Sequence, residues 1–135
     1  MIYYCDGFCF EKNPSPLGGG YTIVNKNKKL IAHEKIYKQN FTNNEAELLG
    51  IYNSLRVAKK NDTVVSDSQI CIGWVYRKLA GSRIDLNNIA KDANSMMVAR
   101  QVHLAWQPRD VNLAGKYNEQ FERYLEKYAN KTTNK

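Results

Sequence analysis

The sequence predicts an α/β domain with a mixed five-stranded sheet, and three observations lead to this fold class. Three short strand-like runs near the N-terminus are separated by turn-forming residues, which favours an antiparallel meander. Two later strand-like runs each follow a helical segment, and a strand reached through a helical crossover lies parallel to its predecessor. The helical segments carry apolar residues at helical spacing, so each must cover part of a sheet. We therefore expect three antiparallel strands and then two parallel ones, with helices on both faces.

The N-terminal part contains the three strands of the meander. The first strand is expected over residues 2–6, and the next two over residues 21–25 and 29–36, joined by the polar turn 26–28. Between the first two strands, residues 13–20 contain prolines followed by three adjacent glycines, which predicts a loop that begins stiff and ends flexible. These glycines match no dinucleotide or Walker fingerprint, so no phosphate loop is expected.

A capping box marks the start of the longest helix. Thr42 is followed at the third position by Glu45, so each side chain can satisfy a backbone N–H, and the helix is expected to run through Ala58. Glu47 stands one turn before Ile51, on the face that packs on the core. A carboxylate on such a face is costly unless a metal ion, a buried salt bridge or a hydrogen-bonded acid neutralises it.

The second half of the chain alternates helices with the two remaining strands. Residues 63–66 form a β-branched run that predicts a buried strand, and Asp67 follows it directly. Helices are expected over residues 68–79 and 85–100, and a strand over residues 102–106 follows them.

A last helix and a polar tail complete the chain. Asn112 can cap this helix, and its apolar face is expected to consist of Leu113, Tyr117, Phe121, Tyr124 and Tyr128. A chain of 135 residues suits one domain. We place that domain over residues 1–129, with a polar tail over residues 130–135.

Composition narrows the classes of function. The longest apolar runs are too short to span a membrane, and the N-terminus lacks the basic and apolar regions of a secretory signal. Three cysteines make neither a disulfide framework nor a zinc site. We therefore expect a cytoplasmic protein with no membrane partner, and we expect a monomer.

The charge of the chain points to an anionic partner. The formal net charge is +7 and the isoelectric point is near 9.3, with lysines gathered in several clusters. Such an excess suits a polyanion, because neutralising phosphates releases counterions and drives binding. A solvated, soluble surface is the alternative, and the charge alone does not decide between the two.

Three acids carry the predicted chemistry. Asp6 ends the first predicted strand, Asp67 directly follows a later one, and Glu47 lies near a helix start. All three are therefore expected to converge on the edge where open α/β sheets bind ligands. Their oxygen-only donor set, with no nearby histidine or thiol, suits Mg²⁺ or Mn²⁺. Two such ions about 3.5–4 Å apart activate water and stabilise the leaving oxygen in phosphodiester hydrolysis. Each acid alone is also compatible with a structural role; it is their convergence that favours catalysis.

Three short motifs lie in order along almost the whole chain. They are Asp6-Gly7-Phe8-Cys9 with Asn13-Pro14 and the glycine run, Thr42-Asn43-Asn44-Glu45-Ala46-Glu47, and Ser66-Asp67-Ser68-Gln69. Together they resemble the leading motifs of type 1 ribonuclease H. The resemblance implies a ribonuclease H-like fold and an endonuclease that cuts the RNA strand of RNA–DNA hybrids. It also implies two Mg²⁺ ions, with Mn²⁺ as a substitute, and products with 5′-phosphate and 3′-hydroxyl ends.

The same resemblance assigns roles to individual residues. Asp6, Glu47 and Asp67 would be the metal ligands. The residues that would line the minor groove of the hybrid, where 2′-hydroxyls distinguish RNA from DNA, are Asn13, Asn43, Asn44 and Gln69. Thr42 would approach a phosphate of the DNA strand. A plain helix cap is the alternative for Thr42, and turn or cap roles are the alternatives for the asparagines.

The sequence departs from the family on the last helix. The family's fourth carboxylate lies four residues after an Asn, where this chain has Lys116. Glu119, one turn further along the same face, is expected to replace it, and a surface ion pair with Arg123 is the alternative. The loop histidine of many members is also absent, and Arg109 lies near its place.

These departures leave two alternative functions open. The segment between Leu79 and Asp85 is too short for the basic protrusion with which some bacterial members grip substrate. The chain is then either a nuclease that relies on its other lysines, or a ribonuclease H-like module that binds hybrid or duplex and cuts poorly. A nuclease of the same fold acting on DNA is the second alternative.

Overall fold

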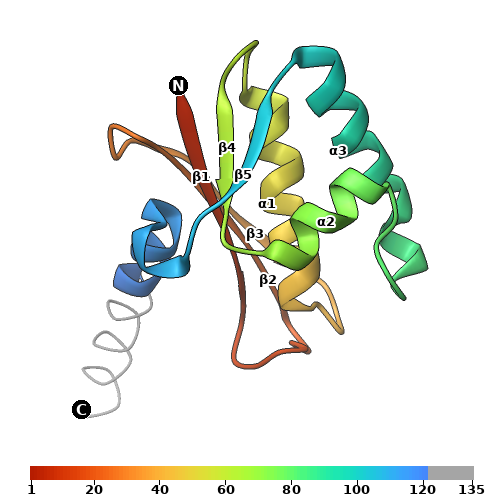
Figure 1. Cartoon of the computed structure of the whole chain (residues 1–135). Coiled ribbons are helices and arrows are strands. Elements are labelled where there is room, and N and C mark those ends of the chain that lie inside the picture. The colour runs from red at the N-terminus through yellow and green to blue at the C-terminus, as the bar shows by residue number, and fades with distance from the viewer. Residues whose placement is uncertain (122–135) are drawn as a thin grey trace.

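A mixed five-stranded sheet forms the centre of the protein (Figure 1). The computed structural model describes residues 1–121. The strands are β1 (Ile2–Cys9), β2 (Gly18–Asn25), β3 (Leu30–Tyr37), β4 (Thr63–Ser66) and β5 (His103–Trp106). They lie in the order β3-β2-β1-β4-β5, with β2 antiparallel to β1 and β3, and with β1, β4 and β5 parallel. The predicted sheet is confirmed.

Helices cover both faces of this sheet, as the sequence predicts. The helices α1 (Asn43–Val57), α2 (Gln69–Arg77) and α3 (Asn87–Arg100) lie on one side. The helix that begins at residue 113, described as far as residue 121, lies on the other side (Figure 1). Side-chain alternation along β1 explains this arrangement, because Cys5 points into the core beneath α1 and Asp6 points to the last helix.

The first two strands are longer than the sequence predicts. β1 continues past Asp6 to Cys9, because the glycines expected in a flexible loop are instead the first residues of β2 and pair with it. The two strands approach so closely that a Cβ on Gly19 would lie 2.0 Å from the carbonyl oxygen of Phe8. Asp6 therefore lies inside a strand rather than at its end, and the connecting loop is confined to residues 10–17.

Two helix boundaries also differ from the predictions. α2 ends at Arg77, because Lys78 adopts the left-handed conformation (φ 63°) and its N–H bonds to two carbonyls of the last turn. The helix expected from residue 85 begins as a short 3-10 turn, Ile84–Leu86, before it continues as α3.

The capping box at the start of α1 is only half formed. The Glu45 N–H donates to Thr42 Oγ1 at 3.1 Å, as predicted. The Glu45 carboxylate does not return to the Thr42 N–H but pairs with Lys38 at 2.5 Å and with Arg83 at 3.0 Å. Two cations within reach are a stronger attraction for a buried carboxylate than one neutral amide.

The core lies between the sheet and the α1–α3 layer. Leu48, Ile51 and Leu55 of α1 are fully buried against it, as the helical spacing predicts. The last helix differs, since Leu113, Tyr117 and Phe121 are only half-buried. As far as residue 121, the buried residues of this helix are Ala114, Gly115 and Asn118, whose small size lets the helix backbone approach β1.

Some expectations concern residues beyond 121. Arg123, Tyr124, Tyr128 and the tail over residues 130–135 lie outside the described residues. Among the helices within residues 1–121, none has the length and apolar character that crossing a membrane requires.

Candidate active site

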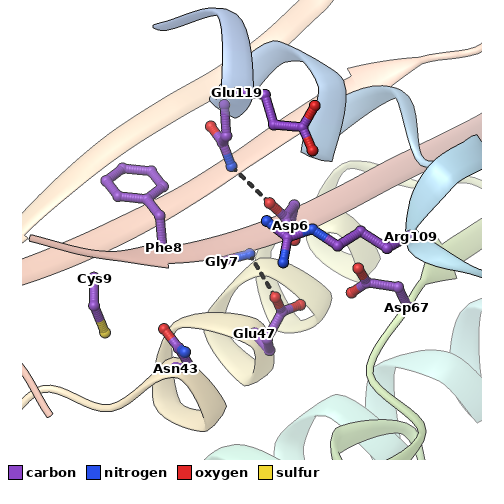
Figure 2. A pocket seen from close by; sticks show the side chains of 10 residues that line it. Asp6, Gly7, Phe8, Cys9, Asn43, Glu47, Asp67, Arg109 and Glu119 are labelled. Atoms are coloured by element: carbon purple, nitrogen blue, oxygen red, sulfur yellow. Dashed lines mark hydrogen bonds between the residues drawn. The ribbon is translucent and has the colours of Figure 1, made fainter. Parts of the chain in front are cut away.

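A polar pocket opens where β1 and β4 separate. The two strands pair only as far as Tyr4 and Val65, so the second half of β1 lies beside open space beyond the end of β4. The pocket there has a volume of about 250 Å³. Its lining, drawn in Figure 2, consists of Asp6, Gly7, Phe8, Cys9, Asn43, Glu47, Asp67, Arg109, Asn118 and Glu119.

Three acids from separate elements meet in this pocket. Asp6 comes from β1, Glu47 from the N-terminal part of α1, and Asp67 from the position directly after β4. One carboxylate oxygen of each acid lies within 4.8 Å of an oxygen of both others. The structure thus brings together the three acids that the sequence analysis singles out.

Gly7 makes this close approach possible. Its N–H donates to Glu47 Oε1 at 3.0 Å. A Cβ at Gly7 would lie 2.5 Å from the backbone nitrogen of Glu47, so any side chain there would force α1 away from β1. The glycine after Asp6 therefore fixes the separation of the strand and the helix that carry two of the acids.

Burial and mutual repulsion act on the acids together. Burial raises the pKa of Glu47 well above its ordinary value, and the charges of Asp6 and Asp67 raise it further. Burial and the charge of Asp6 also raise the pKa of Asp67, while Arg109 opposes that rise. Arg109 lies in the short 3-10 turn after β5 and reaches into the pocket (Figure 2). Among the residues that the structure describes, Arg109 is the cation that lines this pocket with the three carboxylates.

The donor set of this pocket fits a divalent metal ion. Glu47 Oε2 is buried, and among the described residues it has no hydrogen-bond partner. A buried carboxylate oxygen without a partner is costly, and a bound cation would remove that cost. Three carboxylates without histidine or thiolate are the ligands that Mg²⁺ and Mn²⁺ prefer.

Asn112 fixes the start of the last helix above the pocket. Its Nδ2 donates to the carbonyl of Cys5 on β1 at 2.9 Å, and its Oδ1 accepts the backbone N–H groups of Ala114 and Gly115. The predicted cap is confirmed, and it also attaches the helix to the strand that carries Asp6. A Cβ on Gly115 would lie 3.8 Å from Asp6, which is ordinary van der Waals contact.

The last helix presents Asn118 and Glu119 to the pocket and turns Lys116 away. Glu119 is exposed to solvent but lines the pocket beside Asp6 (Figure 2). Lys116 is exposed and borders a separate groove together with Lys28. The lysine at the family's fourth acid position therefore does not enter the acid cluster.

The residues predicted to bind substrate differ in their relation to the pocket. Asn43 lines it, and its N–H donates to Asn13 Oδ1 at 3.0 Å. Asn44 is half-buried, and its carbonyl accepts the Cys71 thiol. Gln69 is exposed at the first position of α2. Of these four asparagine and glutamine side chains, the structure brings only Asn43 into the pocket with the acids.

Thr42 is engaged within the protein. Its hydroxyl accepts the Glu45 N–H and a second hydrogen bond from Arg83 Nη1 at 2.9 Å. The cap that the sequence allows is formed, and a contact from Thr42 to a DNA phosphate stays a prediction.

Sequence reasoning missed Asn118, Thr22 and His33, which are linked to Asp6. Asn118 Nδ2 donates to Asp6 Oδ2 at 2.9 Å, and the Thr22 hydroxyl contacts both Asn118 and His33. Local spacing does not single out Asn118, because Leu113, Tyr117 and Phe121 form the predicted apolar face of this helix. The burial of Ala114 and Asn118 is set by the packing of the helix on the sheet.

Known proteins resemble this chain over most of its length. The RNase H family model matches residues 1–129. A curated ribonuclease H of Treponema denticola is 29% identical over 100 residues, which cover 73% of this chain but only 55% of that protein. The chain thus aligns with about half the length of this relative.

Solved structures share the fold. The N-terminal RNase H domain of a Mycobacterium tuberculosis protein superposes with a TM-score of 0.62 at 22% identity, covering 84% of this chain and 90% of that one. RNase H1 from the halophilic archaeon Halobacterium salinarum superposes with a TM-score of 0.65 at 20% identity, covering 90% of this chain and 97% of that one. With the family model spanning nearly the whole chain and the three motif acids meeting in one pocket, this protein belongs to the RNase H family.

Proposed function

We propose that this protein is a metal-dependent endonuclease that hydrolyses the RNA strand of RNA–DNA hybrids. The observation that carries the proposal is the acid cluster, in which a buried Glu47 oxygen has no partner among the described residues while Asp6 and Asp67 lie beside it. Family membership supports the same reaction class. Two Mg²⁺ ions are the expected cofactors, Mn²⁺ is the expected substitute, and the expected products carry 5′-phosphate and 3′-hydroxyl ends.

The residues of the pocket have distinct tasks in this proposal. Asp6, Glu47 and Asp67 would hold the divalent ions, which supply Lewis-acid stabilisation of the phosphate oxygens and a water nucleophile of lowered pKa. Gly7 keeps Glu47 in place through its N–H. Arg109, the cation beside Asp67, is placed to neutralise negative charge on the scissile phosphate.

Recognition of the hybrid is assigned to the polar groups around the pocket. The minor groove of a hybrid presents 2′-hydroxyls on one strand only, and amide side chains can both donate to and accept from them. Asn43 lies in the pocket and is tied to Asn13, and we assign the groove contacts to these two residues with Asn44 and Gln69. Thr42 is assigned to a phosphate of the DNA strand. Because binding relies on lysines, affinity should fall steeply with salt.

Glu119 is the proposed fourth acid. It lines the pocket beside Asp6, whereas Lys116 borders another groove. Glu119→Gln should therefore reduce Mg²⁺-dependent cleavage, and Lys116→Gln, a matched control on the same helix, should not. Full activity of Glu119→Gln would remove Glu119 from the site. Rescue of Glu119→Gln by Lys116→Asp would instead show that the family position is the one used.

Cleavage of a labelled hybrid in Mg²⁺ and in Mn²⁺ tests the function itself. The RNA strand of the hybrid should be cut internally, while all-DNA and all-RNA duplexes should remain intact. Binding without cleavage in either metal would select a hybrid-binding module, and cleavage of the all-DNA duplex would select a DNA nuclease. Analysis of the fragment ends tests the product chemistry, and sedimentation tests the expected monomer. Fractionation of cells tests the expected cytoplasmic location.

A further inference from the structure

We propose that Asn118, Thr22 and His33 form a positioning chain that holds the Asp6 carboxylate as a metal ligand. The proposal rests on the function proposed above, since it concerns the same metal site. These three residues come from the last helix, β2 and β3, and the metal-site motifs contain none of them.

The sheet register places this chain in line. Asp6 on β1 lies opposite Thr22 on β2, and Thr22 lies opposite His33 on β3, so the three side chains stand in a row on one face. Asn118 descends on this row from the last helix. It donates from Nδ2 to Asp6 Oδ2 at 2.9 Å, and its Oδ1 lies 2.5 Å from the Thr22 hydroxyl.

The hydrogen bonds among these residues all run towards Asp6. The amide of Asn118 donates from Nδ2 to Asp6 Oδ2 and accepts the Thr22 hydroxyl at Oδ1. The single hydroxyl hydrogen of Thr22 is then used on Asn118. Since Thr22 Oγ1 lies 2.8 Å from His33 Nδ1, that nitrogen must be the donor. Each donor in the row therefore points towards Asp6, and successive bonds polarise one another.

The far end of the chain is fixed by aromatic packing. The His33 ring stacks on Phe8 at 5.2 Å between centroids and contacts Tyr117 and Phe121 at 5.4 and 4.9 Å. Its Nε2 is buried, with no partner in residues 1–121, which matches a neutral ring with its hydrogen on Nδ1. The ring is thus a rigid donor rather than a solvated base.

Burial makes the hydrogen bonds of this row hard to replace. Thr22 is fully buried and Asn118 is 6% exposed, so neither finds water to replace a lost partner. Glu47 and Asp67 repel the Asp6 carboxylate, and an unrestrained side chain would turn away from them. Asn118 occupies Oδ2 and prevents this rotation, which leaves the remaining lone pairs of Asp6 directed at the ion site. Outer residues of this kind typically change metal affinity by about 10–100-fold.

Thr22→Val is the sharpest test, because it deletes only the hydroxyl in the middle of the row and does not touch Asp6. We expect calorimetric titration of the metal-free protein with Mn²⁺ to show affinity about tenfold weaker than wild type. Thr22→Ser keeps the hydroxyl and should restore wild-type affinity. In cleavage assays, kcat at a fixed, subsaturating Mn²⁺ concentration should fall with little change in KM for the hybrid, since no proposed substrate contact is altered.

A matched control separates positioning from loss of stability. Asn94 on α3 is also a buried amide, donating to the carbonyl of Val75, and it lies in the α2–α3 layer away from the pocket. Asn94→Leu should lower stability without changing the Mn²⁺ affinity. If Thr22→Val does not fold, His33→Phe keeps the stacked ring and removes the Nδ1 donor, and it should also weaken Mn²⁺ binding.

Nitrogen-15 resonances of the His33 ring provide a readout that is independent of the metal. Wild type should show the hydrogen on Nδ1, and Thr22→Val should lose this preference while Thr22→Ser keeps it. Wild-type Mn²⁺ affinity in folded Thr22→Val or His33→Phe would overturn the positioning chain even if the protein cuts hybrids. A different result would refute the proposed activity alone. In that case the variants bind Mn²⁺ more weakly, as expected, but the wild-type protein cuts no hybrid, and the positioning chain is retained.

Discussion

Two glutamates two residues apart on α1 have opposite surroundings. Glu45 is buried against Lys38 and Arg83, which pair with its two oxygens at 2.5 and 3.0 Å. Glu47 lies beside Asp6 and Asp67, and its Oε2 has no partner among the described residues. One carboxylate has two cations from the protein itself, whereas the other has two further anions.

The difference shows which acid is structural and which is part of the site. Ion pairs within the protein neutralise Glu45, so it needs nothing from solution and stabilises the junction of α1 with the segment before α3. Burial and two acids raise the pKa of Glu47, and among the described residues Arg109 alone offers a positive charge in the pocket, so a bound cation would balance the cluster. Charged residues left without partners inside a protein mark sites whose missing component is a ligand.

The largest expected effect separates the two glutamates by activity. Glu47→Gln, like Asp6→Asn and Asp67→Asn, should reduce hybrid cleavage by more than about 100-fold, because even residues that only support a metal ligand cost about 10–100-fold. Glu45→Gln should keep most of the activity. Initial rates on a labelled hybrid in Mg²⁺ provide the measurement. Equal losses in Glu45→Gln and Glu47→Gln would contradict the distinction.

Metal-linked stability should distinguish the same pair. A ligand that binds only the folded protein stabilises it by about 2.7 kcal/mol at 100 times its Kd. Mn²⁺ should therefore raise the Tm of wild type and Glu45→Gln, and raise that of Glu47→Gln far less. Melting curves in EDTA and across a Mn²⁺ series test this, with Ca²⁺ as a comparison ion. An equal rise in all three proteins would mean that Mn²⁺ binds elsewhere.

Without metal, Glu45→Gln should destabilise the protein and Glu47→Gln should not. Glu45→Gln breaks two ion pairs, and we expect a loss of roughly 1–3 kcal/mol, moderated because Lys38 and Arg83 can regain water. Glu47→Gln removes a buried charge from a repelling cluster and should leave the protein as stable as wild type or more so. Urea unfolding in EDTA at pH 7 measures both, and destabilisation by Glu47→Gln would show that its charge is already balanced.

The smallest expected effect is the pH dependence of the stability difference between metal-free wild type and Glu47→Gln. The pKa of Glu47 is raised in the folded protein, so the folded state binds the Glu47 proton more tightly than the unfolded state does. The stability of metal-free wild type should therefore gain relative to Glu47→Gln as pH falls through the folded pKa. The greater stability of Glu47→Gln should disappear as the pH approaches about 4.3, the pKa of a glutamate in the unfolded chain. If the stability difference between wild type and Glu47→Gln is constant from pH 7 to pH 4.5, the pKa of Glu47 is not raised in the folded protein.

Much of the fold could be read from local patterns. The five strands, the order of the elements and the caps at Thr42 and Asn112 follow from side-chain spacing and short-range hydrogen bonding. The errors occur where long-range pairing overrides local preference. In isolation, Gly19 and its neighbours look like a flexible loop. In the structure they belong to β2, where they allow a close approach to β1, and their pairing extends β1 past Asp6.

The site could be predicted only in part for the same reason. The three acids could be identified from the sequence for two reasons. Glu47 lies on the core-facing side of a helix, where a carboxylate is costly, and Asp6 and Asp67 lie at the ends of predicted strands. The rotation of the last helix was not identifiable, because Ala114, Gly115 and Asn118 carry a weak apolar signal beside Leu113 and Tyr117. That rotation decides that Asn118 and Glu119, and not Lys116, enter the pocket.

The sequence by itself determined the order of strands and helices and the identity of the three acids, because periodicity, caps and the cost of an inward carboxylate are local properties of the chain. Only the tertiary structure decided that their oxygens lie within 4.8 Å of one another, that Glu45 is neutralised and Glu47 is not, and that Asn118 holds Asp6. These outcomes depend on contacts between residues up to 112 positions apart, such as Asp6 with Asn118. Their geometry is set by how closely helix and strand backbones can pack.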